Sequence, residues 1–510
     1  MKIIFRADAS LKIGTGHIMR CLTLAEELKN KGAEVGFICR DLPGNLAGFI
    51  RSKSCDVYLL PASDDSLDSS GQNISKLNNC LGGLSEGDAL ETHDILLSIE
   101  CVDWLIVDHY ALDKNWETLQ RDVADNILVI DDLADRVHDC DLLLDQNFYA
   151  EMAVRYTDLV PAYCQQLLGP KYTLLRKEFR EVRSQMQKRR HKVNKIFVFF
   201  GGVDATNMTS KVLDAVVSAE LGAINFDVVI GSTNPHREYL ESLCEQAENI
   251  TLHIQVNNMA KLMSEADLCI GSGGTVTWER CCLGLPTMAF SVAENQDLLL
   301  KDSAKAGLVY VPDVETHSSD DIELHLKALL QNIYLREHIS QTGLKTVDGR
   351  GALRLANMLI KPEIELRLAT LSDMENIYSW RNDLSVRQYS HNPAEIDYAQ
   401  HKLWFEKIVG DSERPILIAS LQGLNLGVVR FDINDDQAEV SIYLVSNMQG
   451  NGYGSALLSA GEQWLIQRHK KIKNIIAEIL PDNIASQKLF ELSGYIPNTI
   501  RYQKSIAPCL

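Results

Sequence analysis

Short apolar runs, each followed by a stretch long enough for a helix, recur along more than half of this 510-residue chain. They form two series, at residues 2–8, 33–41, 103–110 and 127–135, and then at 195–202, 226–232, 250–255, 268–274 and 285–291. Strands that are apolar throughout are buried on both faces of a sheet, and strands separated by helices are usually parallel. The pattern therefore predicts an α/β fold with two Rossmann-like halves and a cleft between them.

Changes of pattern divide the chain into three domains. A charged stretch at residues 180–195 separates the two halves, which we assign to residues 1–185 and 190–348. The strands of the last part are joined by hairpin-like links and followed by helices, so we assign an α+β domain to residues 363–505. A polar segment rich in glycine and serine, residues 63–91, is expected to be a loop or an irregular insertion.

The composition favours an enzyme of small molecules over a protein that binds polyanions. Asp and Glu number 69 against 50 Lys and Arg, and this net charge of -19 disfavours nucleic acid and anionic lipid, although basic residues crowd the N-terminus. We see no signal peptide and no run of ~20 apolar residues, so we expect a cytoplasmic protein without membrane insertion. The twelve cysteines lack zinc-like spacing, so we expect buried, reduced thiols and no metal.

The first candidate site lies at the start of the first predicted helix. In GTGHIMR, Gly14 and Gly16 allow the backbone to approach a ligand, and a helix start favours anionic groups. His17 and Arg20 follow at the carboxyl end of the first strand, where open α/β sheets bind ligands. An imidazole in that place suits a general base. A purely structural histidine is an equally good interpretation of this motif alone.

The second half carries a complementary motif, GSGGTVTWE, between a strand and a helix. Gly273, Gly274 and Thr275 offer backbone amides and a hydroxyl to a diphosphate. Glu279 follows one helical turn later, where its carboxylate can accept both hydroxyls of a ribose. The loop at residues 201–207 either faces the same cleft or is a structural turn. The spacing predicts a nucleotide site.

These motifs together resemble the GT-B glycosyltransferases of the MurG type. More closely, RADAS…GTGHIMRCLTLA, IDDLADRVHDCDLLLDQN, GPKYTLLRKEF and FFGGVDATN resemble the UDP-2,4-diacetamido-2,4,6-trideoxy-β-L-altropyranose hydrolases of pseudaminic acid biosynthesis, over about residues 1–345. The resemblance implies a GT-B-like enzyme that passes a UDP-linked amino sugar to water without a metal, with His17 as the base.

The same resemblance implies which residues hold the UDP-sugar. They are Gly14, Gly16, Arg20, Gly273, Gly274, Thr275, Glu279, Asn295 and Gln296. Asp8, Asp108 and Tyr110 follow predicted strands near the cleft, as candidate site residues or as ordinary strand-end polar groups. Because UDP is already a good leaving group, such a site mainly needs to orient the substrate and remove a proton from water.

The last domain carries a third motif, QGNGYG, between a strand and a helix, where successive backbone amides can chelate a pyrophosphate. With LPDNIASQKLFELSGY it resembles the GNAT acyl-CoA-dependent N-acetyltransferases over about residues 363–503. YSWRND resembles the enzyme that acetylates the 4-amino group of the same UDP-sugar. The resemblance implies acetyl-CoA as co-substrate, bound by Val445, Gln449, Gly450, Asn451, Gly452, Tyr453, Gly454 and Asn483.

Acetyl transfer to an amine needs a proton acceptor and a proton donor. Only the neutral amine is nucleophilic, and Glu439 is the candidate acceptor of its proton, with a merely solvated glutamate as the alternative. Phe490 stands where many family members carry a tyrosine acid, and phenylalanine donates no proton. Tyr495, Tyr443 or water would then protonate the leaving thiolate.

The two resemblances imply adjacent steps of one pathway. A bifunctional enzyme would acetylate the 4-amino group of a UDP-sugar and then hydrolyse the product to UDP and free sugar. Two alternatives remain for the front half, which could be a glycosyltransferase with a sugar or lipid acceptor, or a noncatalytic UDP-sugar-binding module that feeds the acetyltransferase.

Overall fold

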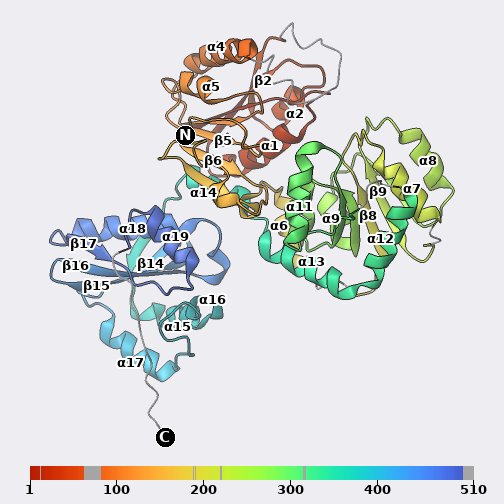
Figure 1. The fold of residues 1–510 in the computed structure, drawn as a ribbon. Coiled ribbons are helices and arrows are strands. Elements are labelled where there is room, and N and C mark those ends of the chain that lie inside the picture. The colour runs from red at the N-terminus through yellow and green to blue at the C-terminus, as the bar shows by residue number, and fades with distance from the viewer. Residues whose placement is uncertain are drawn as a thin grey trace. The chain divides into compact units, whose positions relative to one another are not determined.

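The chain forms two compact units, residues 1–356 and 357–510. The computed structural model describes residues 1–11, 13–62, 82–187, 189, 191–218, 221–313 and 318–497. The first unit contains two sheets and the second contains one (Figure 1).

The first sheet has seven strands in the order β3-β2-β1-β4-β5-β6-β7, all paired in parallel. They are β1 (Lys2–Ala7), β2 (Glu34–Arg40), β3 (Asp56–Leu60), β4 (Trp104–Asp108), β5 (Ile127–Ile130), β6 (Leu142–Asp145) and β7 (Gln165–Leu168). The main helices are α1 (Gly16–Lys29), α2 (Ala47–Ser52), α4 (Gly82–Ser98) and α5 (Lys114–Leu119). Ile4 shares one core with Ala89 and Trp116, which places α4 and α5 against the same face of the sheet.

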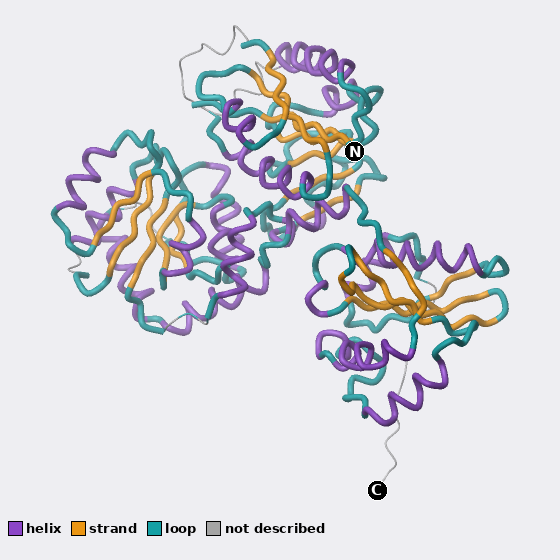
Figure 2. Tube along the Cα trace, turned by 180° about the vertical axis from the view of Figure 1, so that it is seen from behind, coloured by secondary structure: helices purple, strands orange, loops and turns teal. Residues whose placement is uncertain are grey.

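The second sheet has five parallel strands in the order β10-β9-β8-β11-β12. They are β8 (Lys195–Phe199), β9 (Asn225–Ile230), β10 (Ile250–Ile254), β11 (Leu268–Ser272) and β12 (Thr287–Phe290). Phe197 packs in one core while Ile196 and Val198 pack in another, as strand alternation requires when both faces are covered. Figure 2 shows the helices on both sides of these strands.

The remaining long helices up to the start of the second unit are given in chain order, and the last of them, α14, continues past residue 356. They are α6 (Lys177–Gln185), α7 (Met208–Ser218), α8 (Arg237–Glu245), α9 (Met259–Glu265), α10 (Val276–Cys282), α11 (Asp297–Lys305), α12 (Ser319–Gln331), α13 (Ile333–Thr346) and α14 (Gly351–Leu359). The two parallel sheets with their helices confirm the predicted pair of Rossmann-like halves.

The second unit holds a mixed sheet in the order β13-β14-β15-β16-β17. Its strands are β13 (Glu365–Leu368), β14 (Ile416–Leu421), β15 (Leu424–Asn434), β16 (Gln437–Leu444) and β17 (Asn474–Ile476), and its helices are α15 (Met374–Asn382), α16 (Leu384–Arg387), α17 (Tyr398–Ile408), α18 (Tyr453–Arg468) and α19 (Ile484–Leu492). Neighbouring strands are antiparallel except β16 and β17, whose parallel pairing stops at Glu439 and Ile476. The α+β prediction is confirmed.

The expectation of a loop at residues 63–91 is wrong in its last part, because helix α4 begins at Gly82. Glycine and serine at the start of that helix resemble a loop in sequence, but Ala89 and Leu96 are buried in the core of the sheet. Residues 63–81 lie outside the described residues. Among the cysteines that the structure describes, Cys101 is exposed and the others are buried free thiols, as expected.

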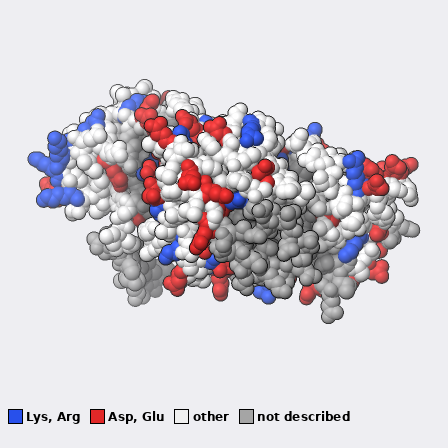
Figure 3. Space-filling view, turned by 90° about the horizontal axis from the view of Figure 1, so that it is seen from above, with Lys and Arg blue, Asp and Glu red and all other residues white. Residues whose placement is uncertain are grey.

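Two observations on the described residues concern membrane spans and surface charge. None of the described helices is long and apolar enough to cross a membrane. On the described part of the face in Figure 3, acidic and basic side chains are interspersed rather than gathered into one continuous basic surface.

Candidate active sites

A histidine and an arginine from the first turns of α1 converge on one carboxylate at the end of β4. The His17 Nδ1 atom lies 2.6 Å from Asp108 Oδ1, and the Arg20 guanidinium donates to both Asp108 oxygens at 2.6 Å. Asp108 is fully buried. We call His17, Arg20 and Asp108 the strand-end cluster. The structure brings these three residues together although 88 positions separate Arg20 from Asp108.

The charges of the strand-end cluster compensate one another. Burial opposes ionisation of Asp108, but the Arg20 guanidinium and the His17 imidazole hold the pKa of its carboxyl well below the ordinary range. Burial likewise opposes the charge on Arg20, and Asp108 holds the pKa of that guanidinium well above its ordinary value. Asp108 is therefore an anion that fixes the orientation of the His17 ring.

Two further side chains complete this end of the sheet. The Tyr110 ring meets the His17 ring edge-on, with centroids 4.6 Å apart. Asp132, which follows β5, accepts a hydrogen bond from Arg20 Nη1 at 3.2 Å. Burial, with the neighbouring Asp132 carboxylate, raises the pKa of Tyr110. Asp132 was missed in the sequence analysis, although its position after an apolar strand is the same signal that singled out Asp108.

The strand-end residue Asp8 belongs to a different network. Its carboxylate pairs with buried Arg6 at 2.7 Å, accepts the backbone N–H of Arg40 at 2.7 Å and lies 3.3 Å from His109 Nε2. These contacts tie β1 to β2 and to the end of β4, which suits a structural role.

The loop before α1 has the backbone that the glycines predicted. Gly14 adopts a left-handed conformation with φ +82°, and its N–H donates to Ser10. A Cβ atom at Gly14 or Gly16 would meet nothing within 4 Å. The N-cap residue Thr15 makes no side-chain capping bond, so the helix start next to His17 is open for a ligand.

The turn between β11 and α10 is shaped by close packing on one side and open space on the other. A Cβ at Gly273 would lie 3.1 Å from the Gln296 side chain, whereas a Cβ at Gly274, which has φ +85°, would meet nothing within 4 Å. Gln296 therefore packs beside the turn, while Asn295 is exposed next to it. The side chain of Thr275 does not cap α10.

Glu279 is shielded from solvent and forms an ion pair with Arg176. Its carboxylate lies 3.5 Å from Arg176, which precedes α6 and also pairs with Glu178 at 2.9 Å. Burial raises the pKa of Glu279, and Arg176 only partly opposes this effect. Arg176 is a second residue that the sequence analysis did not single out, although it lies within the motif GPKYTLLRKEF.

The loop at residues 201–207 has a structural explanation. Asp204, with φ +46°, accepts the backbone N–H groups of Met208 and Thr209 and so caps α7. Gly231 approaches Gly202 so closely that a Cβ there would lie 2.6 Å from a carbonyl oxygen. The structural turn is therefore the better interpretation of this motif.

In the second unit, the loop Gln449–Gly454 leads from β16 to the start of α18. Gly450 and Gly452 adopt left-handed conformations with φ +74° and +84°, and Gly452 is the N-cap of α18 without a side-chain cap. Gln449 Nε2 donates to the Leu444 carbonyl at 3.0 Å, and buried Val445 donates to the Leu426 carbonyl at 3.0 Å. Gly452 thus lies at the positive end of the α18 dipole, a position that favours an anionic ligand.

The remaining residues of this loop pack inward. Asn451 and Tyr453 are buried, and the Asn451 carbonyl accepts from Asn357 Nδ2 at 2.6 Å. A Cβ at Gly454 would lie 3.2 Å from Leu489 of α19. Asn483 caps α19 by accepting the Ser486 N–H at 3.1 Å, a structural role whether or not it also contacts a ligand.

The acid and base candidates differ in their surroundings. Glu439 and Tyr443 lie on the same face of β16, and Glu439 is opposite Asp432. The Tyr443 hydroxyl is buried without a hydrogen-bond partner among the described residues, and burial raises its pKa. The Tyr495 hydroxyl donates to Glu462 at 2.7 Å, and its ring meets buried Phe490 edge-on.

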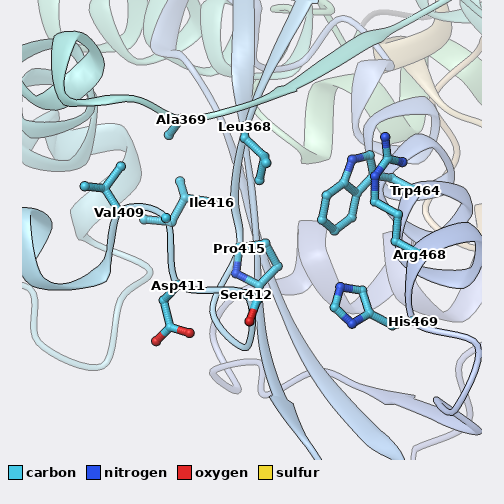
Figure 4. A pocket seen from close by; sticks show the side chains of 11 residues that line it. Leu368, Ala369, Val409, Asp411, Ser412, Pro415, Ile416, Trp464, Arg468 and His469 are labelled. Carbon is cyan, nitrogen blue, oxygen red and sulfur yellow. The ribbon is translucent and has the colours of Figure 1, made fainter.

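A separate cavity of about 240 Å³ lies at the other end of α18. Figure 4 shows Trp464, Arg468 and His469 on one wall, opposite Leu368 and Pro415. Trp464 follows Tyr453 by eleven residues, or about 16 Å along the helix. This cavity is therefore distinct from the Gln449–Gly454 loop. The described residues hold no cluster of His, Cys, Asp and Glu that could bind a metal ion.

Comparison with known proteins separates the two parts of the chain. Residues 363–496 match the acetyltransferase (GNAT) domain family. The chain is 30% identical over 308 residues to the UDP-2,4-diacetamido-2,4,6-trideoxy-β-L-altropyranose hydrolase of Campylobacter jejuni, a match that covers 60% of this chain and 97% of that protein.

Two further comparisons extend over longer stretches. An uncharacterized protein of Methanocaldococcus jannaschii is 24% identical over 518 residues, which cover 97% of this chain and 96% of that protein. The crystal structure of MurG from Acinetobacter baumannii superposes with a TM-score of 0.48 at 14% identity, covering 71% of this chain and 99% of MurG.

Proposed function

Because the chain belongs to the family of the UDP-2,4-diacetamido-2,4,6-trideoxy-β-L-altropyranose hydrolases, we propose that residues 1–348 hydrolyse that UDP-sugar or a close analogue to UDP and free sugar. The strand-end cluster is the observation that carries this proposal. Asp108 binds Nδ1 of His17 at 2.6 Å, so Nε2 is the nitrogen that can take a proton from water.

The proposed reaction is a displacement at the anomeric carbon. The water oxygen forms a bond to that carbon, the water proton moves to His17 Nε2, and the bond from the anomeric carbon to the UDP oxygen breaks with its electron pair on UDP. The imidazolium that results is stabilised by Asp108, which is held as an anion by Arg20.

The second half of the unit would hold UDP. Gly273, Gly274 and Thr275 would bind the diphosphate, since space beside Gly274 is open. Glu279 would bind the ribose, exchanging its contact with Arg176 for the two hydroxyls. Gly14, Gly16, Arg20, Asn295 and Gln296 would line the sugar and phosphate positions.

For the second unit we propose N-acetylation of the 4-amino group of the precursor UDP-sugar by acetyl-CoA. The loop Gln449–Gly454 would bind the pyrophosphate, and Val445 and Asn483 would adjoin the coenzyme. The amine attacks the thioester carbonyl, its proton passes to Glu439 directly or through water, and the thiolate of coenzyme A leaves.

Among the three donors considered for the thiolate, Tyr443 has the strongest support. Tyr495 already donates its proton to Glu462, whereas the Tyr443 hydroxyl has no partner among the described residues. Its raised pKa keeps it protonated and able to donate. Tyr443→Phe should slow acetyl transfer without weakening acetyl-CoA binding.

Both proposed activities act on one sugar skeleton, in the order acetylation and then hydrolysis, as in pseudaminic acid biosynthesis. NMR of the synthetic UDP-4-amino sugar tests the order, because acetylation should need acetyl-CoA and UDP release should follow it. His17→Ala should abolish UDP release and leave UDP binding intact. UDP release that requires a sugar or lipid acceptor would instead indicate a glycosyltransferase, and UDP binding without turnover would indicate a binding module.

A further inference from the structure

A continuous line of hydrogen bonds runs from the strand-end cluster to helix α10. Asp132 accepts from Arg20 at 3.2 Å and from the Asn147 Nδ2 group at 3.4 Å. The Trp278 indole N–H of α10 donates to Asn147 Oδ1 at 2.9 Å. Asn147 follows β6, so one side chain links the end of the first sheet to the helix of the second half.

The orientation of the Asn147 amide is dictated by its partners. An indole N–H can only donate, and an ionised carboxylate can only accept. Position 147 must therefore accept on one side and donate on the other, and a carboxamide does both. Asn147 is 7% exposed and Trp278 is fully buried, so water cannot readily substitute at the indole.

The backbone holds this amide in place independently of both partners. The Asn147 N–H donates to Asp145 Oδ1 at 3.0 Å directly after β6. The neighbouring Gln146 makes a separate bridge, since its amide accepts from the Leu174 N–H at 3.0 Å and donates to Thr275 at 3.3 Å. Of these two bridges, only the one through Asn147 reaches the Asp132 carboxylate, whereas the Tyr149 hydroxyl donates to the Asp132 backbone carbonyl.

We infer that Asn147 is a positioning residue that aligns the His17 base with the UDP-bearing helix α10. The inference rests on the proposed hydrolysis. Tilting α10 against the strand-end cluster would move the anomeric carbon relative to His17, and misplacement by about 1 Å can cost about 100-fold in rate. Asn147 touches neither water nor the sugar in this scheme and acts through Asp132 and Trp278.

Two near-isosteric variants test this role. Asn147→Leu removes both bonds and should lower kcat for UDP release by about ten- to 100-fold, with KM changed less than about threefold. Asn147→Asp places a carboxylate against Asp132. Once that carboxylate is protonated, it again has one donor and one acceptor. The ratio of the kcat of Asn147→Asp to the wild-type kcat at the same pH should therefore rise as the pH falls.

The pH response separates positioning from a purely structural role. A structural defect would lower the unfolding midpoint of both variants without a pH-dependent kcat ratio. Gln146→Leu serves as the contrast, because it removes the bridge to Thr275 and leaves Asp132 untouched, so its kcat ratio should not depend on pH. Wild-type kcat in Asn147→Leu, or a flat ratio in Asn147→Asp, would overturn the inference.

If the wild-type protein releases no UDP, the proposed hydrolysis is refuted. The hydrogen-bonded link through Asn147 can still be tested in that case by a measurement that does not depend on turnover. The chain has six tryptophans, so ¹⁹F NMR of 5-fluorotryptophan protein is tractable, and Trp278→Phe assigns the resonance of Trp278. Asp132→Asn should shift that resonance in the wild-type background and leave it unmoved in Asn147→Leu. An equal shift in both backgrounds would refute the link through Asn147.

Discussion

Asp108→Asn should separate the proposed chemistry from substrate binding. Asp108 is fully buried and accepts hydrogen bonds from His17, Arg20 and the Cys21 thiol. Asparagine keeps the size of the side chain but removes the charge and one acceptor oxygen. The variant therefore leaves the His17 ring without its anionic partner. Asp132 then remains as the carboxylate that is paired with the Arg20 guanidinium.

The structure sets the expected magnitudes. Removing one partner of a buried ion pair costs about 3–5 kcal/mol of unfolding free energy, and the remaining Arg20–Asp132 contact at 3.2 Å favours the lower end of that range. An oriented general base contributes about 10²–10⁴ in rate. UDP release should fall by that factor, while UDP affinity stays within about threefold.

The assay needs three measurements on the same preparation, namely UDP release, calorimetric UDP binding and urea unfolding. Asp88→Asn is the matched control, because Asp88 is also buried and pairs with Arg6 at 2.5 Å and Arg40 at 2.6 Å. It should lose comparable stability but keep its hydrolysis rate. If Asp108→Asn and Asp88→Asn both release UDP at rates within tenfold of the wild-type rate, His17 does not act through Asp108.

Three further predictions address other parts of the chain. Glu279→Ala should weaken UDP binding by roughly 1–3 kcal/mol, as expected for the loss of a charged hydrogen-bonding partner, and unchanged binding by calorimetry would refute the ribose assignment. Burial raises the pKa of Asp145 to about 7, so the folded state holds that proton more tightly than the unfolded chain does, and the associated stability is lost as pH rises from about 4 towards 7. The unfolding midpoint of Asp145→Asn minus that of the wild type should therefore increase between pH 5 and 8, and a constant difference would count against the raised pKa. Gly452→Val should abolish acetylation and spare UDP release from the acetylated sugar, whereas Gly423→Val, which carries the same kind of left-handed strain at φ +77° in a hairpin turn, should spare both; loss of hydrolysis in Gly452→Val alone would show that the two activities are coupled.

Most of the fold was predictable because its periodicity is local. Apolar runs separated by helix-length stretches predicted both parallel sheets, and the hairpin-like spacing beyond residue 362 predicted the α+β domain, whose sheet is mixed. Helix α4 was partly missed because glycine and serine near its start mimic a loop, and its burial depends on contacts with β1 and α5.

The candidate sites were predictable where glycines or strand ends mark them. His17, Arg20 and the turn at Gly273 were found in this way, and the structure joins the first two to Asp108. Asn147 and Arg176 lie within the motifs IDDLADRVHDCDLLLDQN and GPKYTLLRKEF but were not singled out, because their partners Trp278 and Glu279 are more than a hundred positions away. Sequence spacing does not predict contacts between residues so far apart in the chain. The contacts of Asn147 and Arg176 with their partners are visible only in the tertiary structure.

The pairing of β16 with β17 covers only three residue pairs, which leaves a defined length of β16 unpaired on that side. Beyond Glu439 the strand continues for five residues, Val440 to Leu444, without pairing to β17, and these span about 17 Å. If the coenzyme binds as proposed, that interval would separate the pyrophosphate loop from the reacting amine, and the strand would set the distance that the coenzyme arm must span. A coenzyme analogue lengthened by one β-alanine unit should bind through its pyrophosphate yet hold its thioester out of register, and efficient transfer from it would refute this reading of the strand.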